Sequence, residues 1–376
     1  MQSNLVKLPP PTAEGSLPIG VTEVTIYDRG EQQFIELLIT DNLDQKLDRE
    51  PSLASEFESA LSIGIRAAYH NGSGDDKAHL FLQRILYRIN RLNLFWYDDL
   101  RHYTNERSLY LYKVRDQIEA AWQEWEIAKI DVAALQQLDV KQALIERTAY
   151  DLEPPLSAGS RYIREEMTEI GYRHLLAIGS FDGLVEGSRL SRILGGAANP
   201  VQCTLVKVLL EEYGNGRFSR KHSTFFAQML AEFGMNTEPE GYFDLVPWEV
   251  LACANHNFLL TECKRHFLRY SGGLTYFEVA GPSAYKNYLT AAQRLGLSDA
   301  AMGYWELHIR EDERHGRWML DDVALPLAEL YPNDAWELVL GYDQEKLMGD
   351  RAAEAVVQSI RQVEQNTPLA SETQHH

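Results

Sequence analysis

Apolar runs long enough to cross a lipid bilayer are missing from this sequence of 376 residues, which argues against a membrane-spanning protein. Positive charge is scarce as well: 36 lysines and arginines face 55 aspartates and glutamates, and the formal net charge is −19. Because no basic patch accumulates along the chain, we expect it to bind neither nucleic acids nor anionic membrane surfaces.

Cysteine is rare too. The three cysteines, Cys203, Cys253 and Cys263, include no CxxC pair and are odd in number, so we expect neither a disulfide framework nor a cysteine metal site. They suit a reducing cytosol, and residues 1–15 lack the charged and then apolar pattern of a signal peptide. We therefore expect a cytoplasmic location.

Strand signals are nearly absent, and apolar residues recur instead at three- and four-residue spacing. The fold class predicted from this pattern is all-α. Residues 1–20 contain four prolines and predict a flexible arm. A β-prone stretch follows at 21–27 and is a candidate for a lone strand or an edge.

The helical pattern predicts two regions. The first, 21–150, has apolar faces wider than a small helical lobe needs, so we expect it to pack against a second subunit in a homodimer. Residues 136–157, with Pro154 and Pro155, predict the junction to a second domain at 151–376. Six to eight helices are expected there, separated by breakers that include the SGG sequence at 271–273.

One stretch of the second domain carries a metal-binding pattern. In AMGYWELHIREDERHGRWMLDD, His308, Asp312 and His315 fall within roughly 60° of arc on one helix face. Two imidazoles and a carboxylate on one side of a helix can share one or two metal ions. The alternative is a solvated face with ion pairs between successive turns, because HIREDERH is rich in charge.

Two further candidates flank a glycine break. Glu212 precedes the sequence GNG at the end of a helix, where the negative end of the helix dipole disfavours an anion unless a cation lies nearby. His222 follows the break and lies close to an apolar stripe. The alternatives are an ordinary acidic residue at a helix end and a capping or surface histidine.

Carboxylates elsewhere could complete such a site. Asp182 and Glu186 lie one turn apart on a predicted helix, and either could point inward. Glu278 is embedded in the apolar run LTYFEVA, where burial is costly unless the carboxylate is paired or metal-bound. Its alternative role is that of an acid at a helix start after SGG, stabilised by the helix dipole.

Together these residues resemble the ligand set of the haem-oxygenase-like diiron oxidases. The resemblance spans about residues 160–325. It rests on the HxxxDxxH helix and on the sequence EYGNGR followed by a histidine. The second motif is closest to the N-oxygenase branch. The resemblance implies a metal-binding set of seven residues: Glu186, Glu212, His222, Glu278, His308, Asp312 and His315.

The resemblance also implies how two irons would be held. One would be bound by Glu186, His222 and His315, the other by Glu278, His308 and Asp312, with Glu212 as an additional ligand or a bridge. Four residues within about a turn of the ligands are candidates for supporting them, with plain packing or a surface position as the alternative for each: Tyr213, Tyr276, Tyr304 and Arg310. The N-terminal helical part resembles the dimerisation region that precedes the diiron domain in that branch. The strand-rich domain that can follow it is not expected after residue 325.

The reaction implied is dioxygen activation by two Fe(II) ions through a peroxo-diferric intermediate. An oxygen atom would pass to the nitrogen of an amine, amino acid or guanidine in a biosynthetic pathway, and an external electron donor would reduce the irons. The alternative within the fold is oxidative C–C cleavage or decarboxylation of an amino acid or fatty acid. Other classes left open are a helical hydrolase without cofactor, a haem-binding protein and a scaffold without metal.

Overall fold

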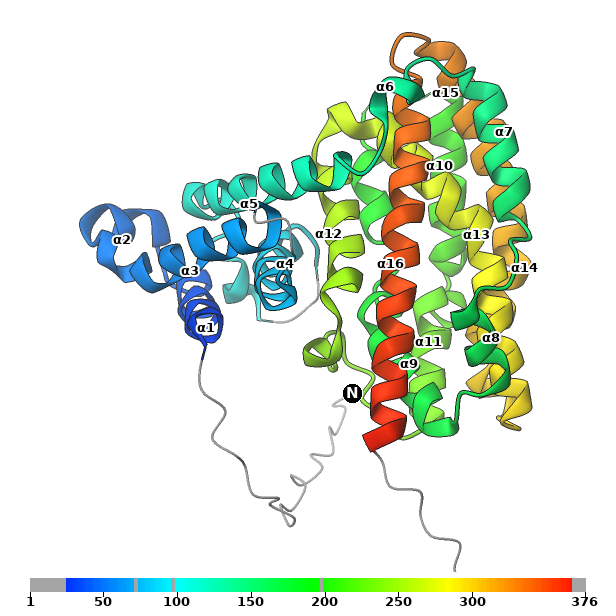
Figure 1. Ribbon diagram of the computed structural model, residues 1–376, viewed down its shortest axis with the longest axis horizontal. Coiled ribbons are helices and arrows are strands. Elements are labelled where there is room, and N and C mark those ends of the chain that lie inside the picture. Colours follow the sequence, from blue (N-terminus) through cyan, green and yellow to red (C-terminus); the bar gives the residue numbers. More distant parts are fainter. Residues whose placement is uncertain (1–24, 71–73, 96–98, 197–198, 367–376) are drawn as a thin grey trace, which may run out of the picture.

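The computed structural model describes residues 25–70, 74–95, 99–196 and 199–366. Throughout these ranges the ordered elements are helices and none is a strand, which confirms the all-α prediction. Figure 1 shows two parts, a small lobe of the first five helices and a long helical bundle beside it. In the described residues no helix is long and apolar enough to cross a membrane. The predicted arm, 1–20, lies outside these residues.

The small lobe packs five helices around buried aromatic and aliphatic side chains. The prediction of a strand at 21–27 is wrong for its described end, because a helix begins at Ile26. Thr25 and Asp28 form a capping box there, each side chain bonding the other residue's backbone N–H, which stabilises the first turn. The lobe contains α1 (Ile26–Leu38), α2 (Leu43–Arg49), α3 (Ser55–Ile65), α4 (Asp76–Asn90) and α5 (Leu109–Ile127).

The predicted junction holds more helix than expected. Two short helices, α6 (Val132–Leu135) and α7 (Val140–Asp151), follow α5, and Asp139 caps α7 by accepting the Gln142 N–H. Helix α7 packs against α13 and α16 of the bundle, although it falls within the range assigned to the N-terminal region. The domain division at residue 150 stays a prediction.

The bundle is built around α13, which packs along both α14 and α16. Helix α16 runs the length of the bundle and is red in Figure 1. The members of the bundle are α8 (Ala158–Glu165), α9 (Glu169–Gly183), α10 (Pro200–Glu212), α11 (His222–Glu232), α12 (Trp248–Glu262), α13 (Phe267–Arg294), α14 (Gly303–Trp318), α15 (Leu325–Leu330) and α16 (Trp336–Asn366).

The expected break at SGG does not occur, because 271–273 lies inside α13. A Cβ atom on Gly272 would lie 2.7 Å from the carbonyl carbon of Leu338, and one on Gly341 would lie 2.7 Å from that of Arg269. Glycine therefore allows the backbones of α13 and α16 to touch where they cross. Its role is close packing between helices rather than termination of one.

Candidate metal centre

A sharp reversal of the chain connects Glu212 to His222. Helix α10 ends at Glu212, and the following Gly214, Asn215 and Gly216 all have positive φ, of +60°, +52° and +78°. A Cβ atom on Gly214 would lie 2.6 Å from the backbone nitrogen of Lys221, so only glycine permits this close return. Helix α11 then begins at His222, whose Nδ1 lies 2.9 Å from Oε2 of Glu212.

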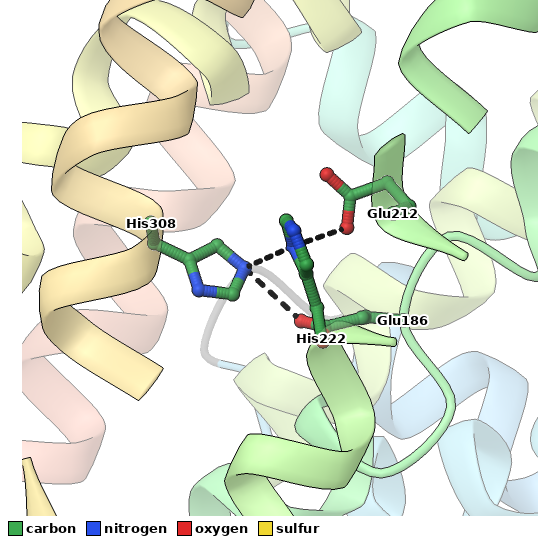
Figure 2. Close-up of side chains that lie close together, drawn as sticks. All are labelled: Glu186, Glu212, His222 and His308. Atoms are coloured by element: carbon green, nitrogen blue, oxygen red, sulfur yellow. Dashed lines mark hydrogen bonds and ion pairs between the residues drawn. The ribbon is translucent and has the colours of Figure 1, made fainter. Parts of the chain in front are cut away.

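Four of the predicted residues form a first group, drawn in Figure 2. One ligand atom from each of Glu186, Glu212, His222 and His308 lies within 4.8 Å of the others. Nε2 of His308 is 3.2 Å from Nδ1 of His222 and 3.4 Å from Oε2 of Glu186. Two imidazole nitrogens and two carboxylate oxygens thus face one small volume.

A second group shares Glu212 with the first. It contains Glu212, Glu278 and His315, again within 4.8 Å. Nδ1 of His315 lies 3.3 Å from Oε2 of Glu278, 3.6 Å from Oε1 of Glu212 and 3.7 Å from Oδ1 of Asp312. Glu278 lies in the middle of α13, so it is not the helix-start acid that was the alternative.

The two groups differ from the expected partition. His308 joins Glu186 and His222, and His315 joins Glu278, so the two histidines are exchanged relative to the sequence-based pairing. The spacing of α14 could not reveal this, because both histidines share one face of that helix. Glu212 has one oxygen directed to each group, which fits the expected bridging position.

The end of α9 separates Asp182 from Glu186. This helix stops at Gly183, so Glu186 lies in the turns beyond it rather than one helical turn after Asp182. Glu186 joins the first group, whereas Asp182 pairs with Arg189.

Neighbouring groups hold the histidines in position. Nδ1 of His308 lies 2.9 Å from the carbonyl oxygen of Tyr304, and Nε2 of His315 lies 2.8 Å from Oε2 of Glu211. Both acceptors lack protons, so each histidine donates its N–H outward and leaves its other nitrogen free to bind a metal. Glu211 was missed as a functional residue; the only signal in the sequence was its position beside Glu212.

The donor atoms fit a pair of divalent cations. Both oxygens of Asp312, Oε1 of Glu186 and Nδ1 of His315 are buried without a hydrogen-bond partner among the described residues. Such atoms are costly to bury unless a ligand satisfies them. Four carboxylates, Glu186, Glu212, Glu278 and Asp312, carry −4 when ionised, which two divalent ions would neutralise.

The pKa values of the cluster residues reflect the excess of carboxylates over cations in the cluster. Burial alone would lower the pKa of His308, but the nearby carboxylates, Glu186 foremost, raise it to about 10. The pKa of His315 is likewise raised to about 10, against the effect of burial, by Glu278 and Glu212. Burial, followed by repulsion from Glu278, raises the pKa of Asp312 well above its usual value. The cluster attracts protons in the place of cations.

The four candidates for supporting the ligands differ in what they contact. Tyr304 donates a hydrogen bond from its hydroxyl to Glu186, and its ring centroid lies 4.1 Å from that of His308, with the two rings tilted by 42°. Tyr276 instead packs against Tyr342, and Arg310 is exposed and pairs with Glu311. The fourth, Tyr213, is 37% exposed, and its hydroxyl lies 3.4 Å from that of Ser188.

A cavity of about 190 Å³ adjoins the cluster. Its wall includes Glu186, Glu278, His308 and Asp312, together with Tyr285, whose ring lies 5.0 Å from that of His308. Tyr285 was not predicted, because in the sequence it looks like any aromatic residue of a packed helix. Asp182, Arg189 and Glu345 also line this cavity.

Comparison with known proteins covers the part of the chain that holds the cluster. Residues 173–344 match the family of iron-containing redox enzymes. The chain is 28% identical over 172 residues to a nitrosourea synthase of Streptomyces achromogenes subsp. streptozoticus. That alignment covers 44% of this chain and 36% of the synthase, so the chain matches about a third of its relative's length. All seven predicted ligands lie within the residues that match the family.

Proposed function

We propose, from the premise that residues 173–344 are a domain of the iron-containing redox enzyme family, that this chain is a non-haem diiron monooxygenase. Its substrate is an amine, an amino acid or a guanidine, and the reaction is N-oxygenation. The substrates and activity of the synthase as a whole are not carried over, since the alignment covers 36% of that protein.

The observation that carries the proposal is the sharing of Glu212 between two buried groups of ligands. A carboxylate with one oxygen near each group is suited to bridging two metal ions. A ligand set of carboxylates and imidazoles suits Fe(II) better than structural Zn(II). Structural zinc is usually held by thiolates and imidazoles in a closed tetrahedron. Iron bound there would supply dioxygen activation and electron transfer.

The reaction balances with one oxidant and one reductant. Dioxygen inserts one oxygen atom into the N–H bond of the substrate and releases the other as water. This requires two electrons and two protons, and the electrons come from an external donor. We therefore expect the purified enzyme to oxidise the substrate nitrogen only when an electron donor is supplied.

The residues of the chain have distinct parts in this function. Glu211 and the carbonyl of Tyr304 orient His315 and His308, and the hydroxyl of Tyr304 orients Glu186. Tyr285 and Tyr304 line the cavity beside the cluster, with their ring centroids 6.1 Å apart. Their aromatic surface would limit the access of water. A dry pocket strengthens electrostatic interactions with the ligands and protects reactive oxygen species from side reactions.

Iron stoichiometry tests the metal site. We expect the wild-type protein, titrated with Fe(II) under anaerobic conditions, to bind two ions per chain. Glu212→Ala should lose tight binding at both positions because it removes the shared carboxylate. Asp182→Asn is the matched control and should retain two ions, because Asp182 pairs with Arg189 instead. A wild-type stoichiometry close to zero would refute the oxygenase.

Product analysis tests the reaction. Iron-loaded enzyme, reductant and dioxygen should convert a responsive amine or guanidine to a hydroxylamine or a more oxidised nitrogen product. An alkene, an aldehyde or released carbon dioxide would instead assign the enzyme to C–C cleavage. We also expect a homodimer formed through the N-terminal lobe, and sedimentation velocity of the full chain would test this assembly.

A further inference from the structure

The turn between Glu212 and His222 presents an aromatic side chain to solvent. Phe218 is 80% exposed, more than any other large hydrophobic side chain of the described residues. An apolar ring gains free energy when it leaves water, and aromatic residues are enriched among those that anchor protein interfaces. The position of Phe218 therefore indicates a contact surface rather than part of the bundle core.

Hydrogen bonds within the turn hold Phe218 in place. Its carbonyl oxygen accepts from the Thr224 hydroxyl at 2.8 Å and from the backbone N–H of Lys221 at 3.1 Å. The backbone N–H of Arg220 also donates to the carbonyl oxygen of Arg217, at 2.8 Å. An anchor that is ordered before a partner arrives loses less conformational entropy on binding.

The charge around Phe218 is positive although the chain as a whole carries −19. Arg217 and Arg220 are exposed, and neither forms an ion pair with another described residue. Lys221 adds a third cation, with its Nζ 4.8 Å from the centroid of the Tyr213 ring. The sequence of the turn, GNGRFSRK at 214–221, contains no acidic residue. We call Arg217, Phe218, Arg220 and Lys221 the cationic turn.

The size of the cationic turn limits the kind of partner that it fits. Three cations are too few for a nucleic-acid surface, which needs an extended basic patch. An exposed aromatic ring flanked by unpaired arginines instead matches a protein whose contact surface carries carboxylates around an apolar centre.

The cationic turn is also the covalent link between two ligands of the cluster. It leads from Glu212, which both groups share, to His222 of the first group. Four residues separate Phe218 from His222, so their Cα atoms cannot be more than about 14 Å apart. Electron tunnelling weakens steeply with distance, so a redox carrier bound here would have a short path to the ligands.

We propose that the cationic turn is the docking site of a small acidic protein that carries one electron at a time. Phe218 packs against the carrier, and Arg217 and Arg220 pair with its carboxylates. Two successive transfers, each of which oxidises one carrier by one electron, supply the two electrons that the reaction consumes, and water supplies the two protons. The inference rests on the proposed function and names the kind of redox partner.

A matched control is needed because the overall charge of the chain repels an acidic partner. Lys46 and Arg49 of α2 are exposed and three positions apart, like Arg217 and Arg220, and α2 lies in the lobe, at the left of Figure 1. Lys46→Glu/Arg49→Glu and Arg217→Glu/Arg220→Glu change the net charge equally, so both gain the same long-range repulsion. Only the second pair changes the charge within a Debye length, about 8 Å, of Phe218.

Binding tests the docking site without the reaction. Calorimetry should compare an oxidised plant-type [2Fe–2S] ferredoxin with an oxidised flavodoxin, both acidic, against the iron-loaded protein in the absence of dioxygen. We expect at least one carrier to bind the wild type, and Arg217→Glu/Arg220→Glu and Phe218→Ala each to weaken it at least tenfold. Lys46→Glu/Arg49→Glu should stay within about twofold of the wild type. Binding of neither carrier, or equal weakening by the two double variants, would overturn the proposal.

Electron transfer provides a second measurement. In stopped-flow mixing, the reduced carrier at a concentration below saturation should be oxidised by the iron-loaded wild type at least tenfold faster than by Arg217→Glu/Arg220→Glu. Dithionite, a small reductant that needs no docking site, should reduce the iron of the two double variants at rates within about twofold of each other. A carrier that is oxidised equally fast by these two variants would also reject the docking site.

The same samples distinguish failure of the docking site from failure of the oxygenase. Iron that is reduced by dithionite and oxidised again by dioxygen, while neither carrier binds, would reject the docking site and retain the oxygenase. A wild type that binds no iron would reject the oxygenase, whereas calorimetry of the metal-free protein with the two carriers would still report on the cationic turn.

Discussion

Glu211 and Glu212 are neighbours in the sequence, yet they contact opposite sides of one imidazole. Oε2 of Glu211 lies 2.8 Å from Nε2 of His315, and Oε1 of Glu212 lies 3.6 Å from Nδ1 of the same ring. The end of α10 thus supplies both a candidate ligand and the group that orients another. Arg314 balances the charge of Glu211 from the outside.

Glu211→Gln tests this orienting role. The amide is a weaker acceptor than the carboxylate, so His315 should be less basic and less firmly oriented. We expect Fe(II) affinity to fall by about 10- to 100-fold, the range for partners behind a metal ligand, with the folded structure retained. Anaerobic titration would measure the affinity, and circular dichroism would check folding. Glu313→Gln, on an exposed face of α14, should bind iron as the wild type does.

Single residues show how far the sequence could lead. His308, Asp312 and His315 were predictable as a unit, because helical periodicity alone puts them on one face. Glu186 could not be separated from Asp182, since the choice depends on where α9 ends. Glu211 was missed because the residue it contacts, His315, is more than a hundred positions away.

The crossing of α13 and α16 shows what the sequence alone could not predict about a helix. From the sequence, SGG at 271–273 predicted a break, because glycine weakens a helix and no local residue contradicts that interpretation. The reason for the glycines lies in another element, where Gly341 meets Arg269 and Leu338 meets Gly272. The all-α class, by contrast, was predictable, since apolar periodicity is local information.

Alanine substitutions at the crossing test this explanation. Gly272→Ala and Gly341→Ala should each destabilise the protein by about 3 kcal/mol or more, since the new Cβ meets rigid backbone rather than a side chain that can move. Gly349→Ala is the matched control on α16, with its Cβ 3.8 Å from the ring of Tyr276. It should stabilise by a few tenths to about 1 kcal/mol, because alanine favours a helix. Urea denaturation would rank the three, and a stable Gly272→Ala protein would contradict the account.

At the scale of the whole molecule, an ion network joins the two parts. Glu126 of α5 is fully buried and bonds Arg351 of α16 and, at 3.0 Å, Lys129. Trp248 and Met348 of the bundle complete the core of the lobe. A lobe attached through a shared core is positioned by the bundle rather than tethered to it. Nothing in the local sequence of α5 pointed to this arrangement.

Arg351→Met should therefore be strongly destabilising. It leaves the carboxylate of Glu126 buried with Lys129 and the indole N–H of Trp122 as its remaining partners, and breaking a buried ion pair by removing one partner costs about 3 to 5 kcal/mol. Arg361→Met, which removes an arginine from an exposed position of the same helix, should cost less than about 1 kcal/mol. Thermal unfolding followed by circular dichroism would compare them. If both variants unfold at the same temperature as the wild type, the network does not stabilise the junction.

The stability of the molecule should also depend on pH through Glu345. Its native pKa of about 7 lies above the ordinary value of 4.5, so between these values the folded protein keeps a proton that the unfolded chain has released. Stability from this group is present at low pH, falls as pH rises toward 7 and then levels off, by roughly 3 kcal/mol in all. Arg189, Asp182 and the Asn257 amide act on this carboxyl. Burial raises the pKa of the adjacent Cys253 thiol, so that group stays neutral throughout this range.

Glu345→Gln removes this titration without removing the side chain. Relative to the wild type, the metal-free variant should gain about 2 to 3 kcal/mol between pH 5 and pH 8, measured by urea denaturation at both values. The histidines of the cluster titrate in both proteins and cancel in the difference. Glu354→Gln should show the same difference from the wild type at the two pH values. A Glu345→Gln difference that does not grow with pH would mean that Glu345 is already ionised at pH 5.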